Sequence, residues 1–478
     1  MKRDRGGLRN SVAINALSLA ILLTFNLGAR AQESPISAAL ANLPSAPIPQ
    51  TAGHTANPQT AASSSQATAP GGAPMMLSVK DAEALALKNN PQISVARLTA
   101  LASQQVTREV RSNLWPTAHI DLTGVDSNPG SRITAGALNN PTVYQRAAAG
   151  AAVSQLLTDF GRTTNLVASS NLAAKAENQN AMATKEQILL AVDQAFYNAL
   201  QTQAVLTVAQ QTVKDRQTVS DQVGALYKSK LKSELDFTFA KVNLAQAKLL
   251  LLDAQNNVNA AQATLSAVLG FQNLQSFQLT EDTSPLAAPV ENVDDLITSA
   301  FTMRPEILAL EFQSESARRF QKAERDLLFP DVQALGVVGD TPVRNPIISS
   351  WYGAVGVNID IPVFNGFLYT ARAREASLRS QAVQEKLRDL RDRIARDVRT
   401  SWLNARTAYD RLAVTQQLLD QANLSLKLAQ SRYNLGLGSI VQLSQAQLQQ
   451  TQAEIANVQA GYDYRLGLAV LQYQTTGL

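Results

Sequence analysis

The stretch Tyr433–Leu443, which reads "YNLGLGSIVQL", places two glycines within three positions. It comes at the end of a segment from Phe367 to Leu435 that contains neither glycine nor proline. A second stretch, Tyr227–Phe237 ("YKSKLKSELDF"), follows a similar segment from Arg162 to Val223. Because glycine and proline are the residues that most often end a helix, these patterns indicate two very long helices, each followed by a tight turn.

The two stretches belong to a longer internal repeat. Their tyrosines lie 206 positions apart, and at this offset Leu231 matches Leu437 and Ser233 matches Ser439. Closer to the N-terminus the offset is 214, and it aligns Pro91 with Pro305, Arg111 with Arg325, Leu114 with Leu328 and Pro116 with Pro330. Self-similarity of this kind indicates a tandem duplication. We therefore predict a first repeat at residues 77–270, a linker at 271–290 and a second repeat at 291–478.

Each repeat is predicted to contain an antiparallel helical hairpin. The outgoing helices cover residues 162–227 and 367–432, and the return helices cover about 233–269 and 439–473. In the second outgoing helix apolar residues recur every three or four positions, at Leu387, Leu390, Ile394, Val398, Trp402, Ala405, Tyr409 and Leu412. Such a narrow stripe is typical of a helix that packs along one seam, as in a coiled coil, and each long helix would measure roughly 100 Å. We expect Gly436 and Gly438 to supply the positive φ angles that the turn requires.

Two strands are predicted ahead of each long helix, at residues 118–125, 145–157, 332–339 and 351–364. In the last of these, apolar and polar residues alternate, which gives the strand one apolar face. Aromatic residues stand near the strand ends, at Trp115, Tyr144, Phe329 and Trp351. The connecting segments 126–142 and 340–348 have the composition of exposed loops. These features favour a membrane β-barrel, although a soluble antiparallel sheet would show the same alternation.

Four strands cannot close a barrel by themselves. Two copies of the chain would supply eight strands, which side chains fill, whereas three copies would supply twelve and leave an open lumen. Because open sheet edges do not occur in lipid, we predict an oligomer, and at least a trimer if it conducts. No run of about 18 apolar residues follows the N-terminal segment, so a membrane-spanning chain would not cross with a helix.

The N-terminal segment predicts export. Residues 1–31 combine a basic start, an apolar middle and the small-residue ending "ARA", which is typical of a cleavable signal peptide; a membrane anchor is the alternative. Cleavage would remove five of the 42 Lys and Arg residues and one of the 38 Asp and Glu residues, which leaves equal numbers of both and no indication of nucleic-acid binding. Residues 32–76 are rich in Ala, Ser, Pro and Thr and are predicted to form a disordered linker. The absence of cysteine excludes disulfides, thiolate chemistry and a lipid-modified N-terminal cysteine.

Several motifs carry a family resemblance: "ALALKNNPQI" (Ala84–Ile93), "RSNLWP" (Arg111–Pro116), "RDLLFP" (Arg325–Pro330), "SQLLTDFGR" (Ser154–Arg162), "NIDIPVFNG" (Asn358–Gly366) and "YNLGLGSIVQLSQAQLQQTQAE" (Tyr433–Glu454). With this ordered set, the chain from Leu77 to Leu478 resembles the TolC-type outer-membrane efflux proteins, or outer membrane factors. The resemblance implies an α plus membrane β-barrel fold, in which a tandem-duplicated protomer contributes four strands to a shared trimeric, twelve-stranded barrel. It also implies very long antiparallel hairpins that form a coiled-coil tunnel in the periplasm.

The resemblance further implies a passive exit duct of a tripartite efflux or type I secretion system. The implied partners are two further copies in a homotrimer, a periplasmic adaptor (membrane fusion) protein, an inner-membrane transporter and outer-membrane lipid. No catalysis, cofactor or metal is expected, and the only histidines, His54 and His119, lie in the linker and in a strand. The alternatives are a periplasmic coiled-coil adaptor and a structural envelope protein. A doubled hairpin with paired strands disfavours both.

Four residues are candidates for the periplasmic gate. The resemblance implies that Asp236 and Tyr433 form polar links between neighbouring hairpins at a closed entrance, and a hydroxyl that donates to a carboxylate contributes about 1.5–3 kcal/mol. The alternatives are a solvated acid at a helix N-terminus for Asp236 and ordinary hairpin packing for Tyr433. Gln442 and Gln445 stand where family members may carry aspartates. We therefore predict a constriction that is less cation-selective and poorly blocked by multivalent cations.

The exposed ends of the hairpins are candidates for docking of the adaptor: Lys230, Leu231, Lys232, Ser233, Gly436, Leu437, Gly438 and Ser439. Small and apolar groups would let an opposing hairpin approach tip to tip. The family often has arginine at the site of Gly438. It usually has glycine at the site of Lys230, so the resemblance does not specify the turn geometry of the first tip. Lys230 and Lys232 would meet acidic residues of the adaptor or simply be solvated.

Overall fold

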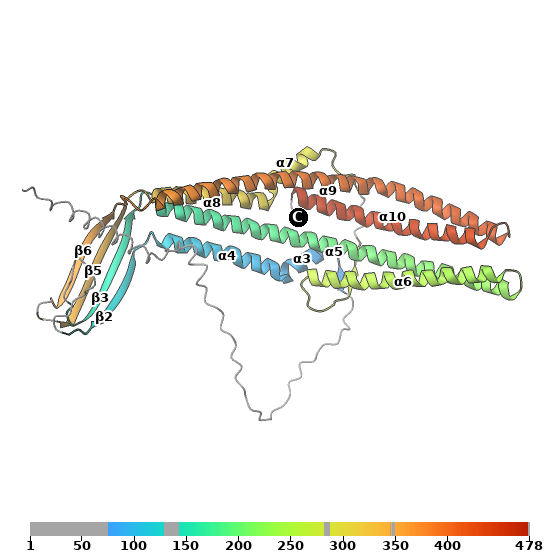
Figure 1. Cartoon of the computed structure of the whole chain (residues 1–478). Helices are drawn as coiled ribbons and strands as arrows, with labels where there is room; N and C mark the ends of the chain where they lie inside the picture. The colour runs from blue at the N-terminus through green and yellow to red at the C-terminus, as the bar shows by residue number, and fades with distance from the viewer. Residues whose placement is uncertain (1–74, 129–142, 282–286, 345, 347–348, 477–478) are drawn as a thin grey trace, which may run out of the picture. The chain divides into compact units, whose positions relative to one another are not determined.

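The computed structural model describes residues 75–128, 143–281, 287–344, 346 and 349–476. The predicted signal peptide at 1–31 and residues 32–74 of the predicted linker lie outside them. Helices dominate, and the order helix, helix, strand, strand, helix, helix occurs twice (Figure 1). The first set consists of α3 (Val79–Asn89), α4 (Pro91–Ser112), β2 (Thr117–Val125), β3 (Arg146–Thr158), α5 (Arg162–Lys228) and α6 (Glu234–Val268). The second consists of α7 (Val293–Met303), α8 (Pro305–Asp326), β5 (Asp331–Arg344), β6 (Trp351–Asp360), α9 (Leu368–Asn434) and α10 (Ile440–Thr475).

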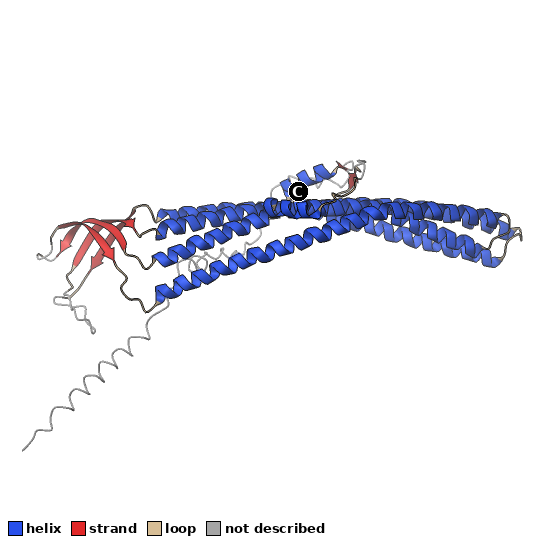
Figure 2. Cartoon of the chain, turned by 90° about the horizontal axis from the view of Figure 1, so that it is seen from above, coloured by secondary structure: helices blue, strands red, loops and turns tan. Residues whose placement is uncertain are grey.

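These four strands form one antiparallel sheet with the order β2-β3-β5-β6 (Figure 1), which Figure 2 draws in red. All four lie where the sequence predicts strands, and β2 and β6 are its open edges within the chain. The predicted loop at 340–348 was wrong for Asp340–Arg344, which continue β5. Proline removes a backbone donor, but the pairing with β3 continues past Pro342 through a register shift between Ala147 and Ala149. Of the other predicted loop, residues 129–142 lie outside the described residues.

The two faces of the sheet differ in polarity. The register places Ile120 of β2, Val338 of β5 and Gly353 of β6 on one face, and Val355 and Val357 follow on that face at 92% and 62% exposure. The opposite face carries His119 and Asp121 on β2, Tyr352 and Asn358 on β6, and Gly150 and Gly339 on the inner strands. Side chains of successive residues alternate between faces. One face is therefore apolar and exposed, while the other, which we call the polar face, carries these polar groups together with Leu335 and Val337.

The long helices α5 and α9 each contain 67 residues, so each is roughly 100 Å long. Both follow a residue in the left-handed conformation, Gly161 with φ 107° and Phe367 with φ 66°. Ile394, Val398 and Ala405 of the predicted stripe are buried, and its other members are half-buried. The prediction of one apolar seam is thus confirmed.

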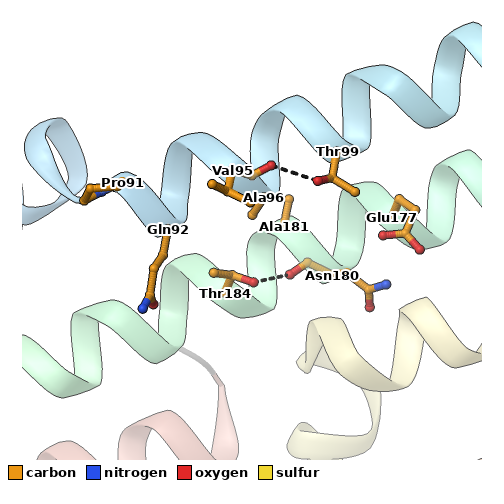
Figure 3. Close-up of a pocket in the computed structure, with 9 residues that line it drawn as sticks. All are labelled: Pro91, Gln92, Val95, Ala96, Thr99, Glu177, Asn180, Ala181 and Thr184. Carbon is orange, nitrogen blue, oxygen red and sulfur yellow. Dashed lines mark hydrogen bonds between the residues drawn. The ribbon is translucent and has the colours of Figure 1, made fainter. Parts of the chain in front are cut away.

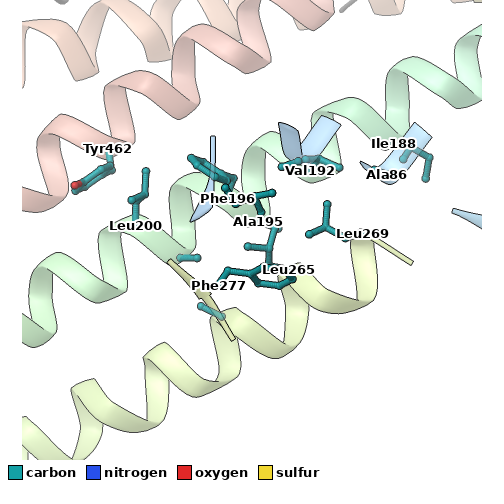
Figure 4. Packing of buried hydrophobic residues seen from close by; sticks show 14 residues of the cluster. Ala86, Ile188, Val192, Ala195, Phe196, Leu200, Leu265, Leu269, Phe277 and Tyr462 are labelled. Carbon is teal, nitrogen blue, oxygen red and sulfur yellow. The ribbon is translucent and has the colours of Figure 1, made fainter. Parts of the chain in front are cut away.

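The two hairpins pack side by side through α5 and α10, while α8 packs between α5 and α9. A core cluster lies where α3, α5, α6 and α10 meet; it includes Ala86, Ile188, Val192, Phe196, Leu200, Leu265, Leu269 and Tyr462 (Figure 4). Beside it, β1 (Met75–Leu77) pairs in parallel with β4 (Phe277–Leu279). The sequence analysis did not predict this small sheet, and it assigned both strands to linkers. Among the described residues, no helix is both long enough and apolar enough to cross a membrane.

Candidate functional site

The first hairpin tip is closed by two backbone hydrogen bonds. The N–H of Leu231 donates to the carbonyl of Leu226 at 2.8 Å, and the N–H of Lys230 donates to the carbonyl of Tyr227 at 2.9 Å. This pattern is a Schellman motif, which needs one residue in the left-handed region. Here Lys230 adopts it with φ 61°. Ser233 then caps α6, so a lysine makes the turn that glycine usually makes.

The second tip repeats this geometry, with N–H to carbonyl distances of 2.8 Å from Leu437 to Arg432 and 3.1 Å from Gly436 to Tyr433. Gly436 has φ 75°, as predicted. The expectation for Gly438 was wrong, because its φ is not positive. A Cβ atom there would lie 3.3 Å from both Arg432 Cβ and the backbone nitrogen of Tyr433, so a side chain at this position would require a small shift of these neighbours.

Tyr433 belongs to a cluster of buried side chains just behind the tips. We call this the tip cluster, and its members are Val223, Ala240, Tyr433, Ile440 and Leu443. They come from all four hairpin helices, so the cluster joins the two hairpins of one chain. The ammonium group of Lys232 lies 3.9 Å from the centre of the Tyr433 ring, a cation–π contact.

Asp236 and Tyr433 are close, but the structure does not join them by a hydrogen bond. The Tyr433 hydroxyl is buried and has no hydrogen-bond partner among the described residues. Burial raises the pKa of Tyr433, and the negative charge of Asp236 adds to the effect. The Asp236 carboxylate instead accepts from the Ser233 hydroxyl at 2.8 Å and the Ser233 N–H at 3.1 Å, which caps α6. Within one chain, Tyr433 packs in the tip cluster and Asp236 caps the N-terminus of α6. Their role as links between hairpins stays a prediction.

Gln442 occupies the position in the second tip that Asp236 occupies in the first. Its side-chain oxygen accepts from the Ser439 N–H at 3.4 Å, so it also completes a capping box. Gln442 and Gln445 are both exposed. The two positions that would carry acids in an acidic ring are neutral, and their predicted effect on ion selectivity remains to be measured.

The predicted docking residues are mostly exposed. Leu231 and Leu437, which match across the repeat, are 70% and 69% exposed. Lys230, Ser233, Gly436 and Ser439 are exposed, whereas Lys232 and Gly438 are half-buried. Exposed leucines at the ends of both hairpins give the tips an apolar contact surface.

The sequence analysis missed a row of buried polar residues between α5 and α10. On α5, Thr212, Arg216 and Ser220 are 6%, 7% and 6% exposed. They face Gln447 and Thr451 of α10, at 3% and 6% exposure. We call these five residues the polar seam. The signal was present in the sequence, because Arg216 lies at helical spacing from Ala209 and Val223, both of which are buried.

A buried carboxyl group, that of Asp193, also lies next to the core cluster. Asp193 of α5 is 4% exposed, and its Oδ1 atom has no hydrogen-bond partner among the described residues. Burial and the neighbouring carboxyl of Glu83 on α3 raise the pKa of Asp193 to about 7. Along α5, burial and the charge of Glu306 likewise raise the pKa of Glu186 to about 7. Nothing in the sequence pattern indicated either shift, because both depend on which helices pack together.

A groove of about 410 Å³ runs between α4 and α5 (Figure 3). Val95, Ala96 and Ala181 supply much of its lining, and Glu177 is its only charged side chain. Among the described residues, no group of three or more His, Asp or Glu side chains is arranged to hold a metal ion.

Comparison with protein-family models gives a match to the outer membrane efflux protein model over residues 84–271 and 296–473. The chain belongs to the outer membrane efflux protein family. The two matched segments correspond to the two sets of elements in the fold. The protein is accordingly located in the cell outer membrane, with its helices on the periplasmic side.

Two curated relatives share this outer membrane efflux protein's sequence pattern. Outer membrane efflux protein BepC of Brucella suis is 21% identical over 354 residues, which cover 68% of this chain and 75% of the relative. The probable outer membrane lipoprotein SilC of Salmonella typhimurium is 22% identical over 390 residues, covering 76% and 77%. The solved structure of CusC has a TM-score of 0.73 at 18% identity and covers 84% of this chain and 92% of its own. At this identity the structural match supports the fold alone.

Proposed function

We propose that this protein is the exit duct of a tripartite efflux or type I secretion system. It conducts passively what an inner-membrane transporter and a periplasmic adaptor deliver. The observation that carries the proposal is the combination, in one chain, of an incomplete sheet with one exposed apolar face and two hairpins of about 100 Å. A periplasmic adaptor or a structural envelope protein would need no such sheet.

The duct is a trimer with a twelve-stranded barrel. The open edges β2 and β6 support this, because each can pair with the other edge of a neighbouring copy and lipid does not tolerate unpaired edges. The apolar face then meets lipid and the polar face lines the lumen. Twelve strands leave an aqueous channel, whereas eight would be filled by side chains.

The helices also have faces that lack a neighbour within one chain. On α4, which packs against α5, the side chains of Val95 and Leu98 are 63% and 58% exposed. On the far side of the hairpins, Val414 and Leu418 of α9 are 64% and 52% exposed. Exposed apolar rows on both lateral sides support a closed ring of copies. The repeated order of elements supports a tandem duplication as the origin of the two hairpins in each copy.

The hairpin tips form the entrance and the docking site for the adaptor. The exposed Leu231 and Leu437 are the contact residues, with Lys230 as a further contact to acidic groups. Asp236 and Tyr433 close the entrance through polar links between neighbouring hairpins, and the neutral Gln442 and Gln445 make its constriction less selective for cations. Crosslinking from a photoreactive residue at position 437 should capture the adaptor in cells, and capture of neither adaptor nor transporter would contradict the docking assignment.

The conduit is tested with the purified full-length protein in a planar lipid bilayer. We expect heat-resistant trimers and discrete conductance steps, because three sheets would enclose one aqueous lumen. A water-soluble single subunit without pore activity would contradict the proposal.

A further inference from the structure

The polar seam separates two apolar parts of the contact between the hairpins. Towards the tips lies the tip cluster, and in the other direction lies the core cluster with Phe196, Leu200 and Tyr462. Any parting of the hairpins at the tips must therefore break the tip cluster and then expose the polar seam. The side chain at its centre is Arg216.

Arg216 is a buried cation with neutral partners. Its Nη2 atom donates to the carbonyl of Gln447 at 2.8 Å and to the Thr451 hydroxyl at 3.1 Å. None of the ion pairs among the described residues involves it. A buried charge without an opposite charge is destabilising, because the lost hydration is only partly replaced.

The acceptors of Arg216 do not depend on it. The Thr451 hydroxyl also donates to the Gln447 carbonyl, at 3.1 Å within α10. Loss of the guanidinium would therefore leave no buried acceptor without a bond, which is the usual reason why removing a buried partner is costly. Whether the polar seam favours or opposes contact between the hairpins is therefore set by the charge of Arg216 itself.

The electrostatics agree with this geometry. Burial lowers the pKa of Arg216, and the nearby charge of Asp215 opposes the change without cancelling it. A lowered pKa means that the closed seam disfavours the charged form. Arginine nevertheless stays charged at physiological pH, so the cost is present whenever the hairpins are in contact and is relieved when water reaches the side chain.

We propose that Arg216 is a release element, a residue whose charge opposes the closed contact between the two hairpins of each chain. It lowers the work needed to part them at the entrance, and the tip cluster supplies the closing contact. This inference rests on the proposed function, because it assigns the release to the entrance of the duct.

The test measures how often the hairpins part. The chain has no cysteine, so Val223→Cys, at a tip-cluster position that is 2% exposed, introduces one buried thiol. Its reaction with a water-soluble maleimide is followed in full-length trimers in lipid vesicles. Leu231→Cys, at a position that is 70% exposed, reports the reactivity of an open thiol.

In the Val223→Cys protein, we expect Arg216→Met to slow the labelling about tenfold, because the apolar side chain removes the cost of a buried charge. Arg216→Gln, which is neutral and still polar, should slow it as well. Lys214→Met removes an exposed charge from the same helix and should leave the rate within about twofold. Labelling at position 231 should be the same in all variants.

Equal or faster labelling in Arg216→Met would overturn the proposal, since a residue that holds the hairpins together would give that result. If neither neutral variant forms trimers, the guanidinium is needed for folding and the proposal is wrong. The labelling requires assembled trimers but no conductance. Trimers that form no pore would contradict the proposed function. The labelling rates of the Arg216 variants would still show whether Arg216 opposes the contact between the hairpins.

Discussion

Lys230 and Gly436 show how far residue identity alone indicates a turn. Both have positive φ at matching positions in the two tips, yet only one is glycine. A side chain in this region costs about 1–2 kcal/mol, which the Schellman bonds and the cap at Ser233 offset in the first tip. The repeat offset predicted both turns. It did not predict the tight surroundings of Gly438, because these depend on the close approach of Arg432.

Tyr433→Phe tests the role of Tyr433 at the entrance, because it removes only the hydroxyl group. The hydroxyl has no partner within the chain, so its removal should leave the stability of the hairpins unchanged or slightly higher. If the hydroxyl donates to a carboxylate of the neighbouring hairpin when the entrance closes, its removal costs the closed entrance about 1.5–3 kcal/mol per bond. We expect severalfold higher single-channel conductance in a planar lipid bilayer.

The control for this change is Tyr227→Phe, at the matching position of the first tip, where the side chain is exposed. It should conduct like the wild type. An unchanged conductance in Tyr433→Phe would mean that Tyr433 contributes packing alone, which is the alternative that the sequence already left open.

At the scale of elements, length and periodicity predicted the long helices and the strands well. The predicted end of the first long helix at residue 227 lies one position from the end of α5 at Lys228. The three-residue strands β1 and β4 were missed because such short strands carry no periodic signal. Asp193 was missed for a related reason: its burial arises only when α3 and α5 pack together.

Asp193 should make the stability of the helical part depend on pH. Its pKa is raised from 3.8 to about 7, so the folded protein binds more protons than the unfolded chain between these values. The stabilising contribution is therefore complete below about pH 4 and lost as pH rises through about 7. Asp193→Asn should gain up to about 4 kcal/mol at pH 8, because the pKa shift is about three units and each unit corresponds to about 1.4 kcal/mol, and almost nothing near pH 4.

Thermal unfolding of detergent-solubilised trimers, followed by circular dichroism across this pH range, measures the effect. Asp253→Asn, which changes an exposed acid on α6, should leave the pH dependence of the melting temperature unchanged. Equal shifts in Asp193→Asn at low and high pH would show that folding does not raise the pKa of Asp193, against this reasoning.

At the scale of the whole molecule, the sequence predicted the architecture better than the site. Hydrophobic periodicity reports which side of a strand or helix faces away from water, so it predicts the elements of the fold directly from the sequence. The contacts of Asp236, Tyr433 and Arg216 depend on which helices meet and on what a neighbouring copy adds, and no pattern within one chain encodes this. The proposed assembly therefore rests on the exposed surfaces of the single chain.

Neighbouring positions of β6 allow a direct test of that assembly. Val355 and Ala354 point to opposite faces, and Val355, at 92% exposure, lies on the apolar one. An arginine that faces lipid near the middle of a membrane strand costs about 2–4 kcal/mol, and a trimer would carry three of them. We expect Val355→Arg to reduce heat-resistant trimers in the outer-membrane fraction severalfold. Ala354→Arg, which points into a wide aqueous lumen, should assemble within about twofold of the wild type. If the two variants assemble equally well, the apolar face does not meet lipid and the shared barrel is wrong.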